Sequence, residues 1–356
     1  MELFSIEDYA RIELANQWGL DKLSWQERIV WATTPNEDWQ KAESPIQYYN
    51  ALENYRKVLA GKSSNATVTL DACSSAIQHI SLIAECPKTA EICNVIGSKR
   101  NDAYSIIHQA TGLPNIPRKL CKNAIMTASY NSQKVPGEIY GTNIDKLYNA
   151  MNQEAPALLQ YVDLVQSMWN KNAYAHSWVM PDNFHVSIPV EKQVTSSVKF
   201  MGNWVDVTQT INAPKNSGKA LPACVIHSLD SLVVRELLTR CSKRITVAPN
   251  KEMEYRLDQL ADLTGFKSAR ILYYRDDSEQ FNLPTKSFDI ISIHDAFKVL
   301  LPYANDLRSQ YNQILHEIAQ SRLFEFILYQ LSGTHWDFHK TNPWGNQILE
   351  ANYSLS

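Results

Sequence analysis

Four side chains, two of them cationic, recur at intervals of four residues in the first half of the chain: Arg118, Lys122, Met126 and Tyr130. On a helix, this spacing places them along one slowly drifting stripe. Pro117 precedes the stripe, and proline favours the first turn of a helix. Two cations at the positive end of a helix dipole are unfavourable unless an anion such as a polyphosphate compensates them. The stripe alone is equally typical of a solvated basic turn followed by core side chains.

Two aspartates stand at the ends of short apolar runs, one upstream of the stripe and one far downstream. Asp71 closes the β-branched run 66–70, and Asp295 follows the apolar run 288–293. Such runs are typical of buried strands. Carboxylates on strand ends, together with a cationic stripe, are the parts that two-metal phosphoryl transfer requires. The residue types therefore indicate chemistry on a polyphosphate.

The three segments together resemble the signature motifs of the phage-type, single-subunit DNA-dependent RNA polymerases. Asp71, with Ser74, Gln78 and His79, is similar to the first motif. The stripe from Arg118 to Tyr130 has the internal spacing of the second motif. The third is matched by the following residues: His294, Asp295 and Phe297.

This resemblance implies DNA-templated RNA synthesis by two-metal nucleotidyl transfer. It implies that Asp71, Asp295 and the carbonyl of Ala72 hold two Mg²⁺ ions. It also implies that Arg118 and Lys122 clamp the triphosphate of a ribonucleoside triphosphate, with Lys122 protonating the leaving pyrophosphate. The remaining nucleotide-binding residues that the resemblance implies lie around the sugar, the base and the phosphates: Met126, Tyr130, Tyr104, Lys22 and His227. Tyr130 and His227 are expected beside the ribose.

Residues 194–208 predict a β-hairpin, because two β-rich runs flank Met201, Gly202 and Asn203. The resemblance implies a promoter-reading hairpin here, with Lys199 and Asn203 contacting DNA. A β-ribbon can enter the major groove. A purely structural hairpin remains the alternative at this point, because the residue types at its tip do not follow the family pattern.

The pattern of helices and strands expected around these residues predicts a mixed, helix-rich α+β fold. Helical patterns cover residues 5–60, 142–172, 251–263 and about 305–331, and a β segment is expected around 270–274. The resemblance implies a right-hand polymerase with palm (1–99), fingers (100–227) and a second palm segment (228–356). The interval 236–289 is longer than the family pattern, and no chemistry is assigned to it.

Three family parts are expected to be absent from this chain: the amino-terminal promoter-binding domain, the thumb and the element Asp-x-x-Gly-Arg. The chain therefore resembles the larger, carboxyl-terminal chain of a split, two-subunit bacteriophage RNA polymerase. The partners this implies are a smaller subunit that carries the thumb, the DNA template and the nascent RNA. We expect that subunit to cover part of the first helices, including Trp18 and Trp31.

Composition is consistent with this interpretation but does not establish it. The chain has 44% hydrophobic and 20% charged residues and a formal net charge of −3, as an ordinary globular protein does. Its six cysteines form no CxxC pair, which favours free thiols. No apolar run approaches the ~18 residues of a membrane helix. Together with the resemblance, these features predict that the protein is located in the cytoplasm of an infected bacterial host cell.

Two other functions compete with RNA synthesis. Related DNA polymerases carry a glutamate five residues after the first aspartate, where this chain has Ala76. They usually carry phenylalanine in the middle of the second motif, where this chain has Met126. Both differences favour ribonucleotides. The second alternative is a non-catalytic DNA-binding subunit, against which the intact Asp71 and Asp295 argue.

Overall fold

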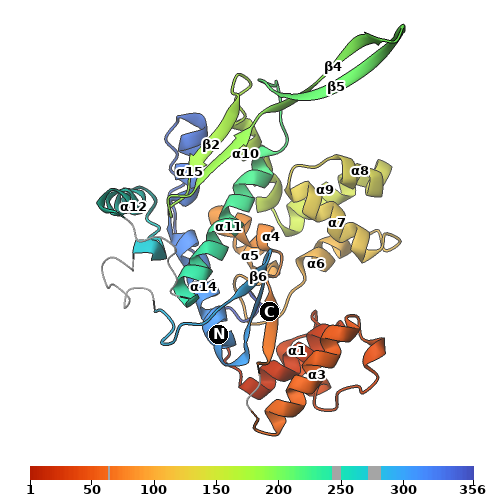
Figure 1. Cartoon of the computed structure of the whole chain (residues 1–356), viewed down its shortest axis with the longest axis vertical. Coiled ribbons are helices and arrows are strands. Elements are labelled where there is room, and N and C mark those ends of the chain that lie inside the picture. Colours follow the sequence, from red (N-terminus) through yellow and green to blue (C-terminus); the bar gives the residue numbers. More distant parts are fainter. Residues whose placement is uncertain (63–64, 243–249, 272–281) are drawn as a thin grey trace.

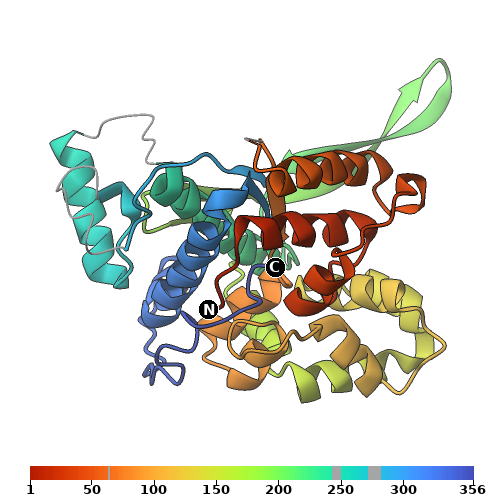
Figure 2. The same ribbon diagram turned by 90° about the horizontal axis from the view of Figure 1, so that it is seen from below.

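The computed structural model describes residues 1–62, 65–242, 250–271 and 282–356, and Figure 1 shows the arrangement of their helices and strands. The chain is 51% helical and 13% strand, which confirms the expected mixed, helix-rich α+β class. A small sheet lies near the middle of the molecule with helices from both ends of the chain around it (Figures 1 and 2). Among the described residues, no helix is both long and apolar enough to span a bilayer.

The central sheet joins two distant parts of the chain. Its strand order is β1 (Thr67–Asp71), β7 (Ala296–Leu300) and β6 (Ile291–Ile293), all antiparallel. Asp71 pairs in register with Ala296, and the turn between β6 and β7 contains Asp295. The sheet register therefore brings the two aspartates to the same end of neighbouring strands.

Helix α4 (Ser75–Ile83) follows β1 and forms the centre of the core, since all nine of its residues are buried. It packs against α11 (Leu221–Ser242) and α14 (Ala304–Gln320). Burying an isoleucine such as Ile77 or Ile80 contributes about 1.5–3 kcal/mol relative to exposure. This packing fixes the direction in which the chain leaves Asp71.

Three helices precede the sheet, as residues 5–60 predicted: α1 (Ile6–Trp18), α2 (Trp25–Trp31) and α3 (Pro45–Leu59). The short turn η1 (Trp39–Lys41) lies between α2 and α3. Ser24 and Glu27 form a capping box at the start of α2. Trp18 and Trp31 pack against each other and against Tyr48. Both rings nevertheless stay partly exposed, and their coverage by a partner stays a prediction.

Residues 87–167 fold into a group of short helices on one side of the sheet, coloured orange to yellow-green in Figure 1. They are α5 (Pro87–Ile92), α6 (Ala103–Ala110), α7 (Arg118–Ser129), α8 (Lys134–Tyr140), η2 (Gly141–Asn143), α9 (Ile144–Glu154) and α10 (Ala157–Ser167). Helix α7 begins at Arg118, directly after Pro117, as predicted. Asn131 just beyond it has a φ of +66°, a left-handed conformation that asparagine tolerates better than most residues.

Two hairpins follow. The strands β2 (Ala175–Val179) and β3 (His185–Pro189) form the first. The strands β4 (Glu191–Phe200) and β5 (Asn203–Asn212) form the second, which projects away from the body of the molecule (Figures 1 and 2). This confirms the predicted hairpin, but its turn is only Met201 and Gly202, both with positive φ, because Asn203 already pairs with Phe200.

The carboxyl-terminal half differs from prediction at two places. The helix expected over 305–331 is two helices, α14 and α15 (Leu323–Ser332), because Ser321 has extended backbone angles of −80° and 161°. Helix α12 (Lys251–Thr264) agrees with the predicted charged helix. In the β segment expected around 270–274, Ala269–Ile271 forms a 3₁₀ turn, η3, and the rest lies outside the described residues. A second 3₁₀ turn, η5 (Leu301–Tyr303), leads into α14.

Candidate active site

A cavity of about 660 Å³ opens at the end of the central sheet, beside α7. Ten of the predicted site residues line it: Lys22, Asp71, Ala72, Tyr104, Arg118, Lys122, Met126, Tyr130, His227 and Asp295. They come from separate parts of the chain. The two predicted DNA-contacting residues, Lys199 and Asn203, do not line the cavity, because they lie at the tip of the projecting hairpin.

The two aspartates are held by backbone hydrogen bonds around the ends of β1 and β7. The N–H of Ala72 donates to the carbonyl of Asp295 at 3.1 Å, and the N–H of Ser356 donates to the carbonyl of Asp71 at 2.9 Å. Asp71 is exposed to the cavity, but the restricted access of bulk water there raises its pKa to about 6, and the nearby charge of Asp295 adds to the effect. Lys22 and Lys122 oppose this rise. Negative charge at this position is therefore stabilised only when cations are close.

This carboxylate pair fits a magnesium site. Mg²⁺ is commonly bound by one or two protein carboxylates, with water and substrate phosphates as the other ligands. No group of three or more His, Cys, Asp or Glu side chains suited to a metal occurs among the described residues. The carbonyl of Ala72 accepts from the N–H of Ser74 at 2.9 Å and keeps a second lone pair.

The two cations of the stripe differ in how they are held. Arg118 forms an ion pair with Asp102, whose carboxylate also caps α6. The hydroxyl of Ser105 accepts from Arg118 Nε at 2.8 Å. Lys122 is exposed to the cavity and lies 5.4 Å from the centre of the Tyr104 ring. Arg118 is thus oriented before any ligand arrives, whereas Lys122 is free to reach one.

Beyond the cations, the stripe ends on an aromatic pair. Tyr130 stacks on His227 with ring centres 5.2 Å apart and an interplanar angle of 21°. Burial raises the pKa of Tyr130, so its hydroxyl stays protonated. Met126 is 37% exposed on the same side of α7. These side chains form a flat, partly apolar wall that suits a sugar and a base.

Asp230 links this wall to the core. Its Oδ1 accepts from Nε2 of the buried His79 at 2.7 Å, and its other oxygen lies 3.9 Å from His227 Nδ1. Burial alone would raise the pKa of Asp230, but the two imidazole rings hold it below its ordinary value. His79 Nδ1 is buried with no partner among the described residues.

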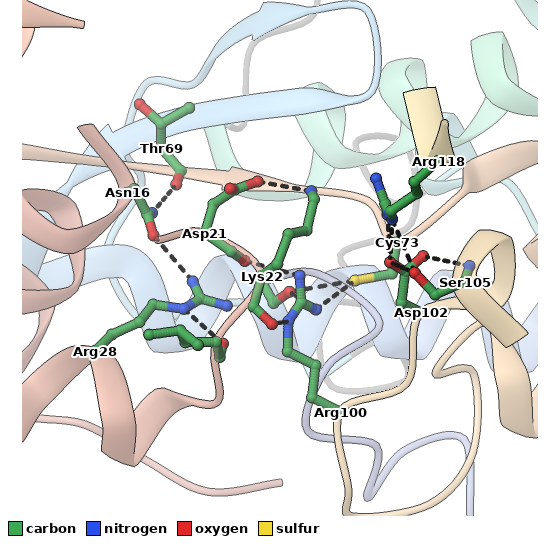
Figure 3. A network of polar contacts seen from close by, with 12 residues as sticks. Asn16, Asp21, Lys22, Arg28, Thr69, Cys73, Arg100, Asp102, Ser105 and Arg118 are labelled. Carbon is green, nitrogen blue, oxygen red and sulfur yellow. Dashed lines mark hydrogen bonds and ion pairs between the residues drawn. The ribbon is translucent and has the colours of Figure 1, made fainter. Parts of the chain in front are cut away.

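The segment around Lys22 forms the edge of the cavity that faces the amino-terminal helices (Figure 3). Lys22 Nζ contacts the carboxylate of Asp21 at 2.6 Å. The guanidinium group of Arg100 donates to the carbonyls of Lys22 and Asp21 at 2.9 and 2.7 Å. The same group reaches Ser356 Oγ at 3.1 Å and Cys73 Sγ at 3.3 Å.

Sequence reasoning missed two residues that shape the site, Arg100 and Asp230. Both line the cavity, but only their tertiary contacts reveal their partners. Asp102 also lines the cavity, and its carboxylate caps α6. Gln78, a residue of the first motif, is instead buried and bonded to the carbonyls of Cys93 and Ser354.

The chain matches no protein-family model and no curated protein. Any functional conclusion therefore rests on the geometry of the cavity.

Asp71→Asn is expected to raise the thermal unfolding midpoint in metal-free buffer at pH 8. The pKa of Asp71 is about 6 in the folded protein, above the ~3.9 of an unfolded chain, so the fold binds this proton more tightly. The wild type therefore loses stability as the pH rises from about 4 to about 6. Asparagine does not ionise, so the advantage of the variant should grow over this interval and stay constant above it.

The measurement is a series of unfolding midpoints between pH 4 and pH 8 with a chelator present. Equal differences between variant and wild type at both ends of the series would contradict the raised pKa.

Proposed function

We propose that this chain is the catalytic part of a DNA-directed RNA polymerase, with palm, fingers and a two-metal nucleotidyl-transfer site. The observation that carries the proposal is the convergence of residues from all three motif-like segments on one cavity. Asp71 comes from β1, Arg118 and Lys122 come from α7, and Asp295 comes from the turn before β7. Chance likeness of three short segments would not bring them to one place.

The charges of the cavity match a nucleoside triphosphate. Asp71 and Asp295 would hold Mg²⁺, which supplies charge neutralisation and a more acidic attacking hydroxyl when it is bound. Arg118 presents a planar guanidinium group suited to two phosphate oxygens. Lys122 has an exposed amino group that can follow the leaving pyrophosphate and donate a proton to it.

Tyr130, His227 and Met126 support ribose and base recognition at the far end of the stripe. Ala76 also lines the cavity, and its methyl group leaves room that a glutamate would fill. This favours ribonucleotides over deoxyribonucleotides. DNA synthesis is therefore an outcome that the experiments below must distinguish.

Tyr130→Phe is expected to make the enzyme accept deoxyribonucleotides more readily. The variant keeps the ring that stacks on His227 but loses the protonated hydroxyl. One lost hydrogen bond of about 1 kcal/mol corresponds to roughly a fivefold change in discrimination. Competition between ribo- and deoxyribonucleoside triphosphates measures the ratio directly. An unchanged ratio would show that Tyr130 only packs against its neighbours.

RNA synthesis also needs a thumb to enclose the RNA–DNA hybrid, and we propose that a smaller chain supplies it. Large apolar side chains remain exposed at the amino terminus and on the first three helices: Leu3, Ile6, Val30, Ile46, Tyr49 and Leu59. Exposed apolar surface of sufficient extent often marks an interface, and an obligate interface typically buries 2,000 Å² or more (order of magnitude). This surface is therefore the proposed contact with the smaller subunit.

The projecting hairpin is the proposed contact with DNA. Lys199 pairs with Trp204, which is 71% exposed, and Asn203 pairs with Phe200. Because neighbouring pairs point to opposite faces, Lys199 and Asn203 cannot both approach the same groove wall. Lys199 and Trp204 together offer a cation and a ring, which suit a phosphate and an adjacent base.

The proposal is tested by extension of an RNA primer on a single-stranded DNA template with Mg²⁺, with and without the thumb-bearing chain. We expect template-directed RNA synthesis that increases strongly when that chain is added. Processive synthesis by the 356-residue chain alone would contradict the split arrangement. DNA synthesis only, or no synthesis with both chains, would contradict an RNA polymerase.

A binding measurement complements this assay. Cys73 lines the cavity, whereas the equally half-buried Cys86 and Cys224 do not. Magnesium and a nucleoside triphosphate should slow alkylation of Cys73 but not of the other two thiols, as read by mass spectrometry of peptides. Equal protection of all three, or of none, would count against a nucleotide in this cavity.

A further inference from the structure

Two arginines hold the loop that carries Lys22 from two sides, and neither of them bonds to a carboxylate there. Figure 3 shows this arrangement. Arg100 bonds to the carbonyls of Asp21 and Lys22 on one side. Arg28 bonds to the carbonyl of Leu23 on the other side, at 2.9 Å. Three successive carbonyls of the loop are therefore taken by two guanidinium groups.

Arg28 is an unusual residue to find in a core. Its side chain is fully buried, lies 4.6 Å from the centre of the Trp25 ring and bonds only to neutral groups in the described structure. Burial lowers the pKa of Arg28 to about 10, with a further contribution from Arg100, so it stays charged at neutral pH. Burying an ion without a partner is costly, which makes a purely space-filling role a poor explanation.

The contacts of Arg28 also reach β1, the strand that ends on Asp71. Its guanidinium group donates to Asn16 Oδ1 at 3.0 Å, and the amide of Asn16 donates to the carbonyl of Thr69 at 3.0 Å. Thr69 lies two residues before Asp71 in β1. Arg28 therefore connects the Lys22 loop to the strand that ends on Asp71.

Arg100 makes a second connection of the same kind. Besides the loop carbonyls, its guanidinium group contacts Cys73 Sγ, and Cys73 lies two residues after Asp71. The two arginines thus link the loop to the chain on both sides of Asp71: Arg28 through Asn16 to Thr69 in β1, and Arg100 to Cys73 beyond the end of β1. Every contact they make with the loop is to its backbone, so the side chain of Lys22 stays free to move.

Lys22 itself is in a position to change partners. Its ammonium group contacts Asp21 with about half of the side chain exposed, and the side chain lines the cavity. The charge of Lys22 also opposes the raised pKa of Asp71. A polyphosphate in the cavity would offer this ammonium group a more highly charged partner than one carboxylate.

We infer that Arg28 and Arg100 are positioning residues that hold the Lys22 loop by its backbone, so that Lys22 can leave Asp21 and bind the phosphates of a triphosphate ligand. The inference rests on the proposed function, because it takes a triphosphate as the ligand. It assigns the two arginines no contact with that ligand. Their effect passes through Lys22.

A double-mutant cycle separates this role from direct contact and from general stabilisation. The probe is inorganic tripolyphosphate with Mg²⁺, titrated calorimetrically into the full chain. The variants are Arg100→Met and Arg28→Met, each alone and combined with Lys22→Met. Lys57→Met, an exposed cation of α3 outside the cavity, is the matched control. Unfolding midpoints of all variants are recorded in parallel.

We expect Lys22→Met to weaken binding about tenfold, as for a lost charge-assisted contact. Each arginine variant should weaken binding severalfold in the wild-type background and by less than twofold in the Lys22→Met background. Arg100→Lys should recover part of the loss, because lysine keeps a donor but not the fork that spans two carbonyls. Lys57→Met should change nothing.

Equal weakening by Arg100→Met in both backgrounds would overturn the inference, because it would mean contact with the ligand or a general loss of structure. No weakening in either background would overturn it as well. If Arg28→Met does not fold, the Arg100 cycle alone decides. Absence of tripolyphosphate binding by the wild type would instead remove the proposed nucleotide site, and the inference with it.

Discussion

Asp71→Asn and Asp295→Asn should each reduce nucleotide addition by about a thousandfold or more while leaving the fold intact. Losing one charge-stabilising group in an active site typically costs 10²–10³ in rate, as an order of magnitude, and here the lost group is also half of the carboxylate pair. Asparagine keeps the size of each side chain. Because the two aspartates are held by their backbones, the strand ends should keep their positions.

The measurement is single-nucleotide extension of a primer under matched Mg²⁺, together with template binding. Asp163→Asn, an exposed aspartate of α10 outside the cavity, is the control and should behave as the wild type does. Asp71→Asn should combine lost activity with the higher stability expected above pH 6. Comparable synthesis by either catalytic variant would remove both aspartates from the chemistry.

Lys122→Met should reduce the rate of nucleotide addition by about 10²–10³-fold, because it removes both a charge and a proton donor from the leaving pyrophosphate. Lys122→Arg keeps the charge, but a guanidinium group does not release its proton. If Lys122 donates a proton, the arginine variant should bind the triphosphate almost normally and still turn over slowly.

Pre-steady-state extension at several triphosphate concentrations separates binding from turnover. Lys119→Met is the matched control, since Lys119 is an exposed lysine of the same helix that does not line the cavity. A Lys122→Arg variant with a normal maximal rate would show that the residue contributes only its charge.

Local features of this fold could be predicted from sequence because they depend on neighbouring residues. Pro117 at a helix start, the Ser24–Glu27 capping box and the apolar run before Asp71 all involve contacts within a few positions. The failure at Ser321 has a physical reason as well. The helical pattern is strong on both sides of Ser321, and no proline or glycine near it indicates a break. The extended backbone at Ser321 nevertheless ends α14 and separates it from α15.

The same distinction between local and long-range contacts applies to the candidate site. The amino-acid sequence specifies which groups are available: two carboxylates, a cationic stripe and an aromatic end at helical spacing. Long-range packing pairs β1 with β7 and brings Asp71 beside Asp295. It also places Asp102 against Arg118, and Arg28 and Arg100 against the Lys22 loop. Spacing along a helix follows from backbone geometry, whereas these contacts join segments far apart in the chain and depend on how the whole core packs.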